Sequence, residues 1–230
     1  MSSLVLFDID NTLLYTGGAG TLSMTQAFAR VFDVENAFVG VEFSGRTDRA
    51  IILDALRFHG LPADDAHFDQ FKRAYLELLD SNLESCQGHL KPGIPRLLDA
   101  LLEHNILLGL QTGNLRDGAF RKLEYYGIAP YFQDGGFGDD CEDRVTMVKQ
   151  AIQLFPDIDA PNIYVLGDTT GDVTSAKENG IFALGVATGS HSCEDLLAAG
   201  ADLAVPDLGD IEYILTRVTG MASMGAGSDV

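Results

Sequence analysis

Four carboxylates stand directly after short apolar runs of the chain, in two pairs. Asp8 and Asp10 form the first pair, and Asp168 and Asp172 form the second. Short unbroken apolar runs are typical of buried strands, and ligands of parallel sheets bind beyond the carboxyl ends of the strands. We therefore expect the two pairs to meet at one edge of a sheet.

Converging carboxylates repel one another. At about 4 Å and an effective dielectric constant near 20, each pair costs about 4 kcal/mol. They stay ionised together only if a cation lies among them. Oxygen-only ligands favour magnesium, which also binds a phosphate oxygen. The sequence therefore predicts a Mg²⁺ site among these carboxylates and chemistry on a phosphate group.

Two further segments could contribute to such a site. Thr112, Gly113 and Asn114 follow another apolar run, and a hydroxyl with successive backbone N–H groups ahead of a helix suits a phosphate oxygen. Arg144 precedes a helical pattern, and its charge could offset that of Asp8 and of a phosphoryl group. Each of these residues alone has an ordinary explanation in a turn, a cap or the surface. The hypothesis depends on four such sites falling at strand ends in one chain.

Composition limits the class of protein. The 230 residues are 46% hydrophobic and 21% charged, which is ordinary for a soluble globular protein. The net charge of −19 disfavours nucleic acid and anionic lipid as partners, and it means that a phosphate ester needs a local cation. Neither a signal peptide nor a run long enough to span a bilayer is visible, so we expect a cytoplasmic protein. The three cysteines have no CxxC spacing, which argues against a zinc site.

Apolar runs alternate with helical patterns over most of the chain, which indicates an α/β fold with a doubly wound parallel sheet. Strands are expected at Leu4–Phe7, Ile106–Leu110, Ile163–Leu166, Phe182–Val186 and Asp202–Val205. Helices are expected at Pro92–His104, Asp117–Tyr126, Val145–Phe155, Thr170–Asn179 and Glu194–Ala199.

A segment after the first strand breaks this alternation. It contains three helical patterns and no clear strand, at Leu22–Phe32, Asp48–Phe58 and Asp65–Ser85. We therefore expect residues 15–88 to form an inserted all-helical cap domain and residues 1–14 with 89–220 to form the catalytic core. Residues 221–230 are rich in small residues and are expected to form a flexible tail.

Together these segments resemble the haloacid dehalogenase superfamily of phosphohydrolases over nearly the whole chain, and in particular its phosphoglycolate phosphatases. Asp8 to Thr12 resembles the DxDxT motif, and Gly167 to Asp172 resembles the GDxxxD motif. Thr112 resembles the lone threonine or serine between them. Arg144, 24 residues before Asp168, stands where the family has a basic residue. That residue is more often lysine followed by proline, so Lys149 is a second candidate.

The resemblance implies a role for each residue. Asp8 would be the nucleophile that forms an aspartyl-phosphate, and Asp10 would protonate the leaving group and then activate water. Thr112 would hold a phosphoryl oxygen, and Arg144 would orient Asp8. The implied magnesium ligands are the Asp8 carboxylate, the Asp10 backbone carbonyl, Asp168, and Asp172 directly or through water.

The helical insertion resembles the type-one cap of this family. The resemblance also implies that the catalytic core is Rossmann-like. The segment from Gly45 to Asp48 resembles a loop that faces the active site in relatives, so Arg46 could contact an anionic part of the substrate. Arg49 is a weaker candidate for the same contact.

These observations predict a Mg²⁺-dependent phosphatase that acts on a small phosphorylated metabolite as a monomer or weak homodimer. The substrate stays open among phosphoglycolate, nucleotides, sugar phosphates and pyrophosphate. Two alternatives remain, a sugar phosphomutase with the same intermediate and a catalytically idle binding module. A dehalogenase is disfavoured because those family members lack the second aspartate, here Asp10.

Overall fold

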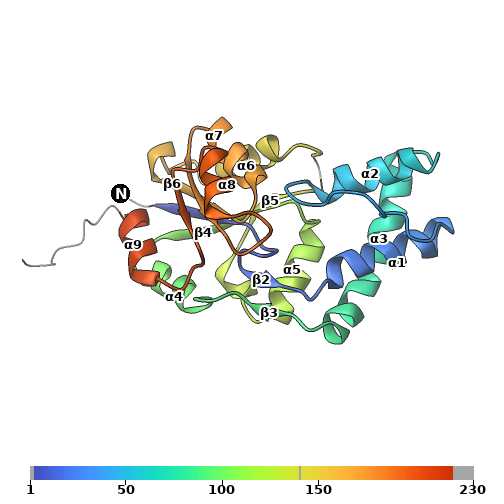
Figure 1. Cartoon of the computed structure of the whole chain (residues 1–230), viewed down its shortest axis with the longest axis horizontal. Helices are drawn as coiled ribbons and strands as arrows, with labels where there is room; N and C mark the ends of the chain where they lie inside the picture. Colours follow the sequence, from blue (N-terminus) through green and yellow to red (C-terminus); the bar gives the residue numbers. More distant parts are fainter. Residues whose placement is uncertain (1–2, 140, 220–230) are drawn as a thin grey trace, which may run out of the picture.

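The computed structural model of the chain describes residues 3–139 and 141–219. Six parallel strands form its main sheet in the order β5-β4-β1-β6-β7-β8 (Figure 1). They are β1 (Leu4–Phe7), β4 (Leu107–Thr112), β5 (Gly135–Phe137), β6 (Ile163–Gly167), β7 (Phe182–Val186) and β8 (Leu203–Val205). This arrangement confirms the predicted α/β fold with a doubly wound parallel sheet.

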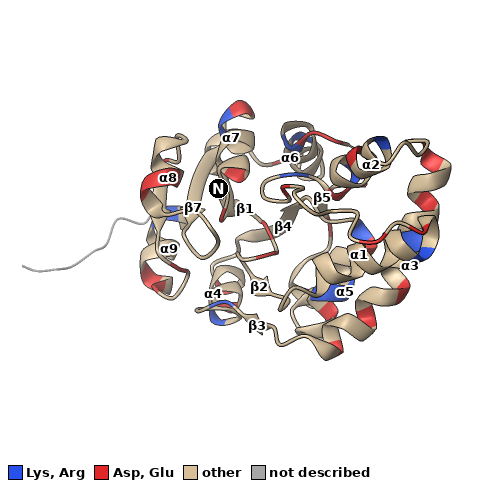
Figure 2. Cartoon of the chain, turned by 45° about the vertical axis from the view of Figure 1, so that its right-hand side comes forward, with Lys and Arg blue, Asp and Glu red and all other residues tan. Residues whose placement is uncertain are grey.

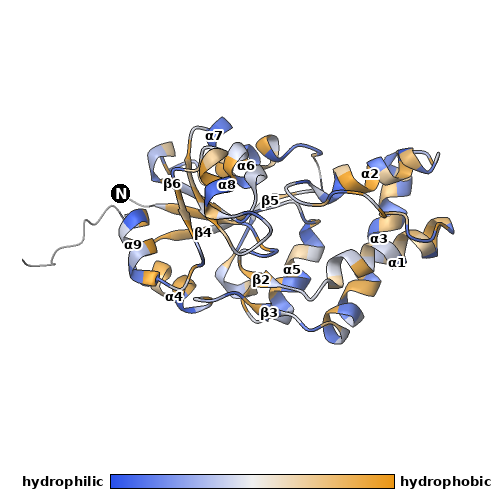
Figure 3. Cartoon of the chain, viewed as in Figure 1, coloured by the Kyte–Doolittle hydropathy of each residue, from blue (hydrophilic) through white to orange (hydrophobic). Residues whose placement is uncertain are grey.

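Helices cover both faces of the sheet because its central strands bury alternate residues on opposite sides. Val5 and Phe7 of β1 pack with α4, α5 and α9, whereas Leu4 and Leu6 pack with α6, α7 and α8. Figure 3 shows the apolar strands enclosed between these two layers. The helices are α4 (Arg96–Glu103), α5 (Arg116–Tyr125), α6 (Arg144–Gln153), α7 (Thr170–Glu178), α8 (Cys193–Ala198) and α9 (Ile211–Thr219). Short 3₁₀ turns lie at Ala129–Tyr131 and Ala160–Asn162.

The five expected strands are present with small differences at their ends, the largest being β4, which continues past Leu110 to Thr112. The expected start of a helix at Pro92 is wrong, since α4 begins at Arg96. Pro95 disfavours helical backbone at the residue before it, and Gly93 has a positive φ of 87°. Besides the two-residue strands at Leu14–Tyr15 and His89–Leu90, one strand and one helix went unpredicted. The β5 strand begins with two glycines, which weaken a strand pattern, and the α9 helix lies near the end of the described residues.

The segment between β1 and α4 contains the three expected helices, α1 (Ala19–Phe32), α2 (Asp48–Phe58) and α3 (Asp65–Ser85). They lie beside the sheet and pack around an apolar cluster of their own (Figure 1). The chain enters and leaves this segment through two short antiparallel strands, β2 (Leu14–Tyr15) and β3 (His89–Leu90). The two chain segments that connect these helices to the rest of the protein therefore lie side by side. The predicted domain boundaries stay predictions, and the predicted tail at 221–230 lies outside the described residues.

Acidic side chains dominate the outer surface, as the net charge of −19 requires. Figure 2 shows acidic residues in helices such as α3, α8 and α9. Within the described residues, no helix combines the length and the apolar character needed to cross a bilayer.

Candidate active site

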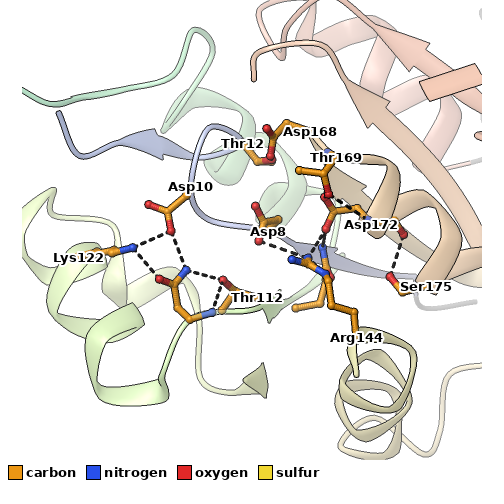
Figure 4. A network of polar contacts seen from close by, with 12 residues as sticks. Asp8, Asp10, Thr12, Thr112, Lys122, Arg144, Asp168, Thr169, Asp172 and Ser175 are labelled. Carbon is orange, nitrogen blue, oxygen red and sulfur yellow. Dashed lines mark hydrogen bonds and ion pairs between the residues drawn. The ribbon is translucent and has the colours of Figure 1, made fainter. Parts of the chain in front are cut away.

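Three neighbouring strands of the sheet end within two residues of the same level, and each places a polar side chain there. Phe7 of β1 pairs with Leu110 of β4 and Leu166 of β6. The residue after β1 is Asp8, whose N–H donates to the carbonyl oxygen of Leu166 at 2.9 Å. Thr112 ends β4 and Asp168 follows β6. The register of the central strands therefore brings these sequence-predicted residues into one site (Figure 4).

Three buried carboxylates converge in this site. Each of Asp8, Asp168 and Asp172 offers an oxygen within 4.8 Å of the other two. Burial, with the negative charge of Asp172 next in size, raises the pKa of Asp8 well above its ordinary value. The same two causes raise the pKa of Asp168 to about 7. An oxygen-only set of ligands whose charges repel one another fits a divalent cation, which would offset that repulsion.

Asp172 is already engaged by neighbouring protein groups. Its Oδ1 accepts hydrogen bonds from Arg144 and from Gln111 Nε2, the latter at 2.8 Å. Its Oδ2 accepts from the N–H and the hydroxyl of Thr169, and the first of these bonds, with the Asp172 N–H donating to Thr169 Oγ1, forms the capping box of α7. With four donors on its two oxygens, Asp172 is better placed to hold Arg144 than to contact a metal directly.

Arg144 reaches the site from the start of α6, where Asp143 caps the helix. Its guanidinium is buried, contacts Asp172, donates to Gln111 at 3.0 Å and lies 3.6 Å from Asp8 Oδ1. A buried cation at this distance opposes the charge of Asp8. The second candidate for the basic residue, Lys149, lies exposed on α6.

Asp10 turns away from the other carboxylates toward Lys122 and Asn114 (Figure 4). Lys122 Nζ and Asn114 Nδ2 both donate to Asp10 Oδ2, at 2.6 and 2.7 Å. Lys122 also donates to Asn114 Oδ1 at 2.6 Å, and Asn114 Nδ2 to the Thr112 hydroxyl at 2.6 Å. One hydrogen-bond network therefore holds Asp10 and Thr112, two of the residues predicted to act in the reaction.

Lys122 went unnoticed in the sequence. It is 3% exposed and lies on the buried face of α5, one residue before Leu123 and three after Ala119. A lysine within an apolar stripe was the available signal, because a buried ammonium group needs an anionic partner.

Backbone groups that follow Thr112 form hydrogen bonds with α2, besides those that could bind a ligand. The N–H groups of Asn114 and Leu115 donate to the Thr112 hydroxyl and to Asp48 Oδ2, and the carbonyl of Gly113 accepts from the N–H of Asp48. A Cβ at Gly113 would lie 2.2 Å from the carbonyl oxygen of Arg46. Glycine is required here by the close approach of the helical segment.

A cavity of about 310 Å³ opens between the strand ends and the helical segment. It reaches all the predicted site residues except Asp172. Its far wall includes Met24, Phe43, Ile51 and Tyr75. This volume is at the lower end of the range for small-molecule sites.

Arg46 also lines this cavity, and its guanidinium forms an ion pair with Asp54. Arg49 contributes nothing to the lining, because it pairs with Asp65 and donates to the carbonyl of Asp139. Of the two candidate arginines, Arg46 is therefore the one beside the cavity.

Known proteins resemble this chain over most of its length. The model of the family described as "Haloacid dehalogenase-like hydrolase" matches residues 5–186. The chain is 28% identical to the "Probable phosphatase IndB" of Dickeya dadantii over 92% of both chains. It is 24% identical to a phosphoglycolate phosphatase of Vibrio vulnificus, over 90% of this chain and 93% of the relative. A hydrolase from Pseudomonas syringae shares the fold, with a TM-score of 0.73 at 18% identity over 97% of this chain and 100% of that one.

Proposed function

The chain belongs to the haloacid dehalogenase-like hydrolases, and we propose that it hydrolyses a small phosphate monoester through a phosphoryl intermediate on Asp8. Family membership and the relatives named as phosphatases support the reaction class. The observation that carries the proposal is the position of Asp8, a buried carboxylate 3.6 Å from the Arg144 guanidinium at the floor of the cavity.

In the first half of the reaction, the Asp8 carboxylate attacks phosphorus while the bond from phosphorus to the ester oxygen breaks. Asp10 gives a proton to the leaving alkoxide. Lys122 and Asn114 both hold Oδ2 of Asp10, so the other oxygen is directed to the leaving group. The Thr112 hydroxyl accepts from Asn114 and keeps its own proton for a phosphoryl oxygen.

In the second half, Asp10 takes a proton from water, and the water oxygen attacks the phosphorus of the aspartyl-phosphate. The bond to Asp8 breaks, inorganic phosphate leaves, and both carboxylates return to their starting state. Arg144 opposes the negative charge that gathers on the transferring group.

We propose Mg²⁺ as the metal, held by the Asp8 and Asp168 carboxylates and the Asp10 backbone carbonyl. When bound, it withdraws negative charge from the phosphoryl oxygens and allows the carboxylates to stay ionised together. Asp172 would meet it through water, since both of its oxygens already accept hydrogen bonds.

We also propose that residues 15–88 act as a cap that encloses the leaving group. Support comes from the separate apolar cluster of the helices and from their share of the cavity wall. Thr112, Gly113 and Asn114 would bind the phosphoryl end of the substrate. Arg46 lies on the cap side of the cavity, but contact with an anionic part of the substrate would require its pair with Asp54 to break.

Release of inorganic phosphate from a panel of phosphorylated metabolites and para-nitrophenyl phosphate tests this proposal. We expect turnover that needs Mg²⁺, is lost with EDTA and returns when the metal is restored. Isomerisation of a sugar phosphate without net phosphate release would instead favour the phosphomutase alternative. An absence of turnover with any substrate and metal would favour the idle binding module.

A further inference from the structure

The cationic side chains around the cavity are already paired with carboxylates before a substrate enters. Among the described residues, three cationic side chains line it, Arg46, Lys122 and Arg144. Lys122 is bound to Asp10, and Arg144 to Asp172 and Gln111. Both lie on the strand-end side, where they serve the reaction itself.

Arg46 is the cationic side chain that the cap contributes to the lining, and an exposed carboxylate already holds it. Asp54 Oδ2 accepts from Arg46, and Asp54 Oδ1 accepts from Arg57 at 2.9 Å. Hydrogen bonding to Arg46 also lowers the pKa of Asp54. Asp54 therefore stays ionised at neutral pH and competes with any anionic group of a substrate for the Arg46 guanidinium.

Apart from Arg46, the described residues of the cap side give the cavity no cation: they add apolar side chains, the hydroxyl groups of Thr16, Thr21 and Ser44, and one carboxylate. Met24, Ile51 and Tyr75 are buried, and the Tyr75 ring stacks on Phe71 with an interplanar angle of 9°. Asp48 is the acidic residue that this side adds to the lining. A carboxylate on the leaving group would lose water here without gaining an unpaired cation.

Building on the phosphatase function proposed above, we propose that the enzyme selects phosphate monoesters of uncharged alcohols and disfavours esters whose leaving group carries a second anion. The phosphoryl group would be bound at the strand ends, and the uncharged carbon skeleton would pack against the apolar cap wall. The relatives named phosphoglycolate phosphatase act on an ester of the opposite kind, so the chain would differ from them in substrate.

The test compares matched esters that differ only by a hydroxymethyl group in place of a carboxylate. The pairs are hydroxyethyl phosphate against phosphoglycolate and glycerol phosphate against phosphoglycerate. Phosphate release by the full chain with Mg²⁺ gives kcat/KM for each ester. We expect the uncharged member of each pair to be favoured at least tenfold.

Two variants probe the cause of this selectivity. Asp54→Asn removes the charge that holds Arg46, and we expect it to raise kcat/KM for phosphoglycolate at least threefold, with little change for hydroxyethyl phosphate. Asp65→Asn is the matched control, because it breaks the corresponding exposed pair of Arg49, which does not line the cavity. It should leave the ratio of the two substrates unchanged.

The outcomes separate this inference from the proposed function. Equal or better hydrolysis of the carboxylate-bearing esters would overturn the inference while leaving the phosphatase function in place. A wild-type ratio in Asp54→Asn would overturn the assignment of selectivity to the pair between Arg46 and Asp54. No phosphate release from these esters, from para-nitrophenyl phosphate or from any other member of the panel would contradict the proposed function itself.

Discussion

The two sides of the cavity differ in how their polar groups are partnered. On the strand-end side, nearly every polar side chain is bonded to another one. This side comprises Asp8, Asp10, Thr112, Asn114, Lys122, Arg144 and Asp168. The cap side is mostly apolar, and its arginine is bonded to a residue outside the lining. Its larger side chains are Met24, Phe43, Arg46, Ile51 and Tyr75, with Asp48 and the hydroxyl groups of Thr16, Thr21 and Ser44 beside them.

From this difference we infer that the strand-end side carries out the reaction and that the cap side selects the substrate. The strand-end side is built on a sheet with its own apolar layers, whereas the cap helices pack around a separate cluster. Apolar side chains that face the cavity from the cap helices, such as Met24 and Ile51, can therefore change with little effect on the strand ends. We expect substitutions at the strand ends to affect every substrate and substitutions in the cap to change the preference among substrates.

The largest effect should follow from Asp8→Asn on the strand-end side. An amide is a poor nucleophile, so activity toward all substrates should fall by roughly 10³-fold or more. The fold should persist, because the ionised Asp8 carboxylate is itself unfavourable where burial raises its pKa. Phosphate release and the melting temperature measure the two quantities, with Asp65→Asn as the control of equal chemistry. Turnover close to that of the wild type would refute the assigned nucleophile.

A smaller loss is expected for Lys122→Met, which keeps an apolar stem of similar length. Without the ammonium group, Asp10 is held by Asn114 alone, and kcat should fall with little change in KM. The fall should be roughly 10- to 100-fold, at or below the low end of the roughly 10²- to 10⁴-fold contribution of general acid–base catalysis, because Asp10 itself is kept. The loss should be greater for an alkyl phosphate than for para-nitrophenyl phosphate, whose leaving group needs less protonation.

Lys177→Met is the matched control for this substitution, since Lys177 forms an exposed ion pair with Asp202. It should leave kcat unchanged for both esters. A loss in Lys122→Met that is equal for the two leaving groups would indicate a structural role for Lys122 instead of a role in positioning Asp10.

The sequence allowed the strand-end side to be predicted because its residues are tied to local patterns. Asp8 and Asp168 each follow a short apolar strand, and the strand register then brings them together without further information. Arg144 also lies 3.6 Å from Asp8 Oδ1, although it is followed by valine. Spacing along the chain decides such positions because strand and residue are neighbours in sequence.

The arrangement of the cap side depends on contacts that the spacing of residues in the sequence does not predict. Arg46 was identified as a candidate, but its partner Asp54 lies two helical turns away on α2 and has no pattern that distinguishes it. The need for glycine at Gly113 arises from the approach of Arg46 across 67 residues of sequence. Lys122 is the exception on the strand-end side: it was missed because its partner Asp10 comes from another element.

The metal-free protein should lose stability as pH rises. The folded pKa of Asp168 is about 7, above the ordinary 3.8, so its contribution to stability is present at low pH and is lost as pH rises through 7. The melting temperature should therefore fall between pH 6 and pH 8. Bound Mg²⁺ should raise the free energy of unfolding by about 2.7 kcal/mol when its concentration is a hundred times Kd. For a chain of this length, the melting temperature should then rise by roughly 5 °C or more.

Thermal unfolding with EDTA or Mg²⁺ at each pH measures the effect, with sodium chloride at matched ionic strength as the control. The gain from Mg²⁺ should be greater at pH 8 than at pH 6, because the carboxylates must be ionised to bind it. An equal gain from sodium chloride would contradict a specific metal site.

The smallest effect should come from Asp48→Asn, which tests the cap side by the same physical principle. Burial raises the pKa of Asp48 from 3.8 to about 7, while Lys122 and the Leu115 N–H lower it less. The folded state therefore holds its proton more tightly than the unfolded state, and stability is lost as pH rises through 7. Asparagine keeps an oxygen for the Leu115 N–H but carries no charge.

The melting temperature of Asp48→Asn relative to the wild type should therefore rise between pH 6 and pH 8, by an amount on the order of 1 kcal/mol in unfolding free energy. Asp65→Asn, at an exposed residue, should show no such trend. Turnover of uncharged esters should change little, since Asp48 binds the backbone of the strand-end side and takes no part in proton transfer. A difference that is independent of pH would mean that Asp48 is ionised in the folded protein throughout this range, and the cap side would then carry a permanent negative charge that repels anionic leaving groups even more strongly.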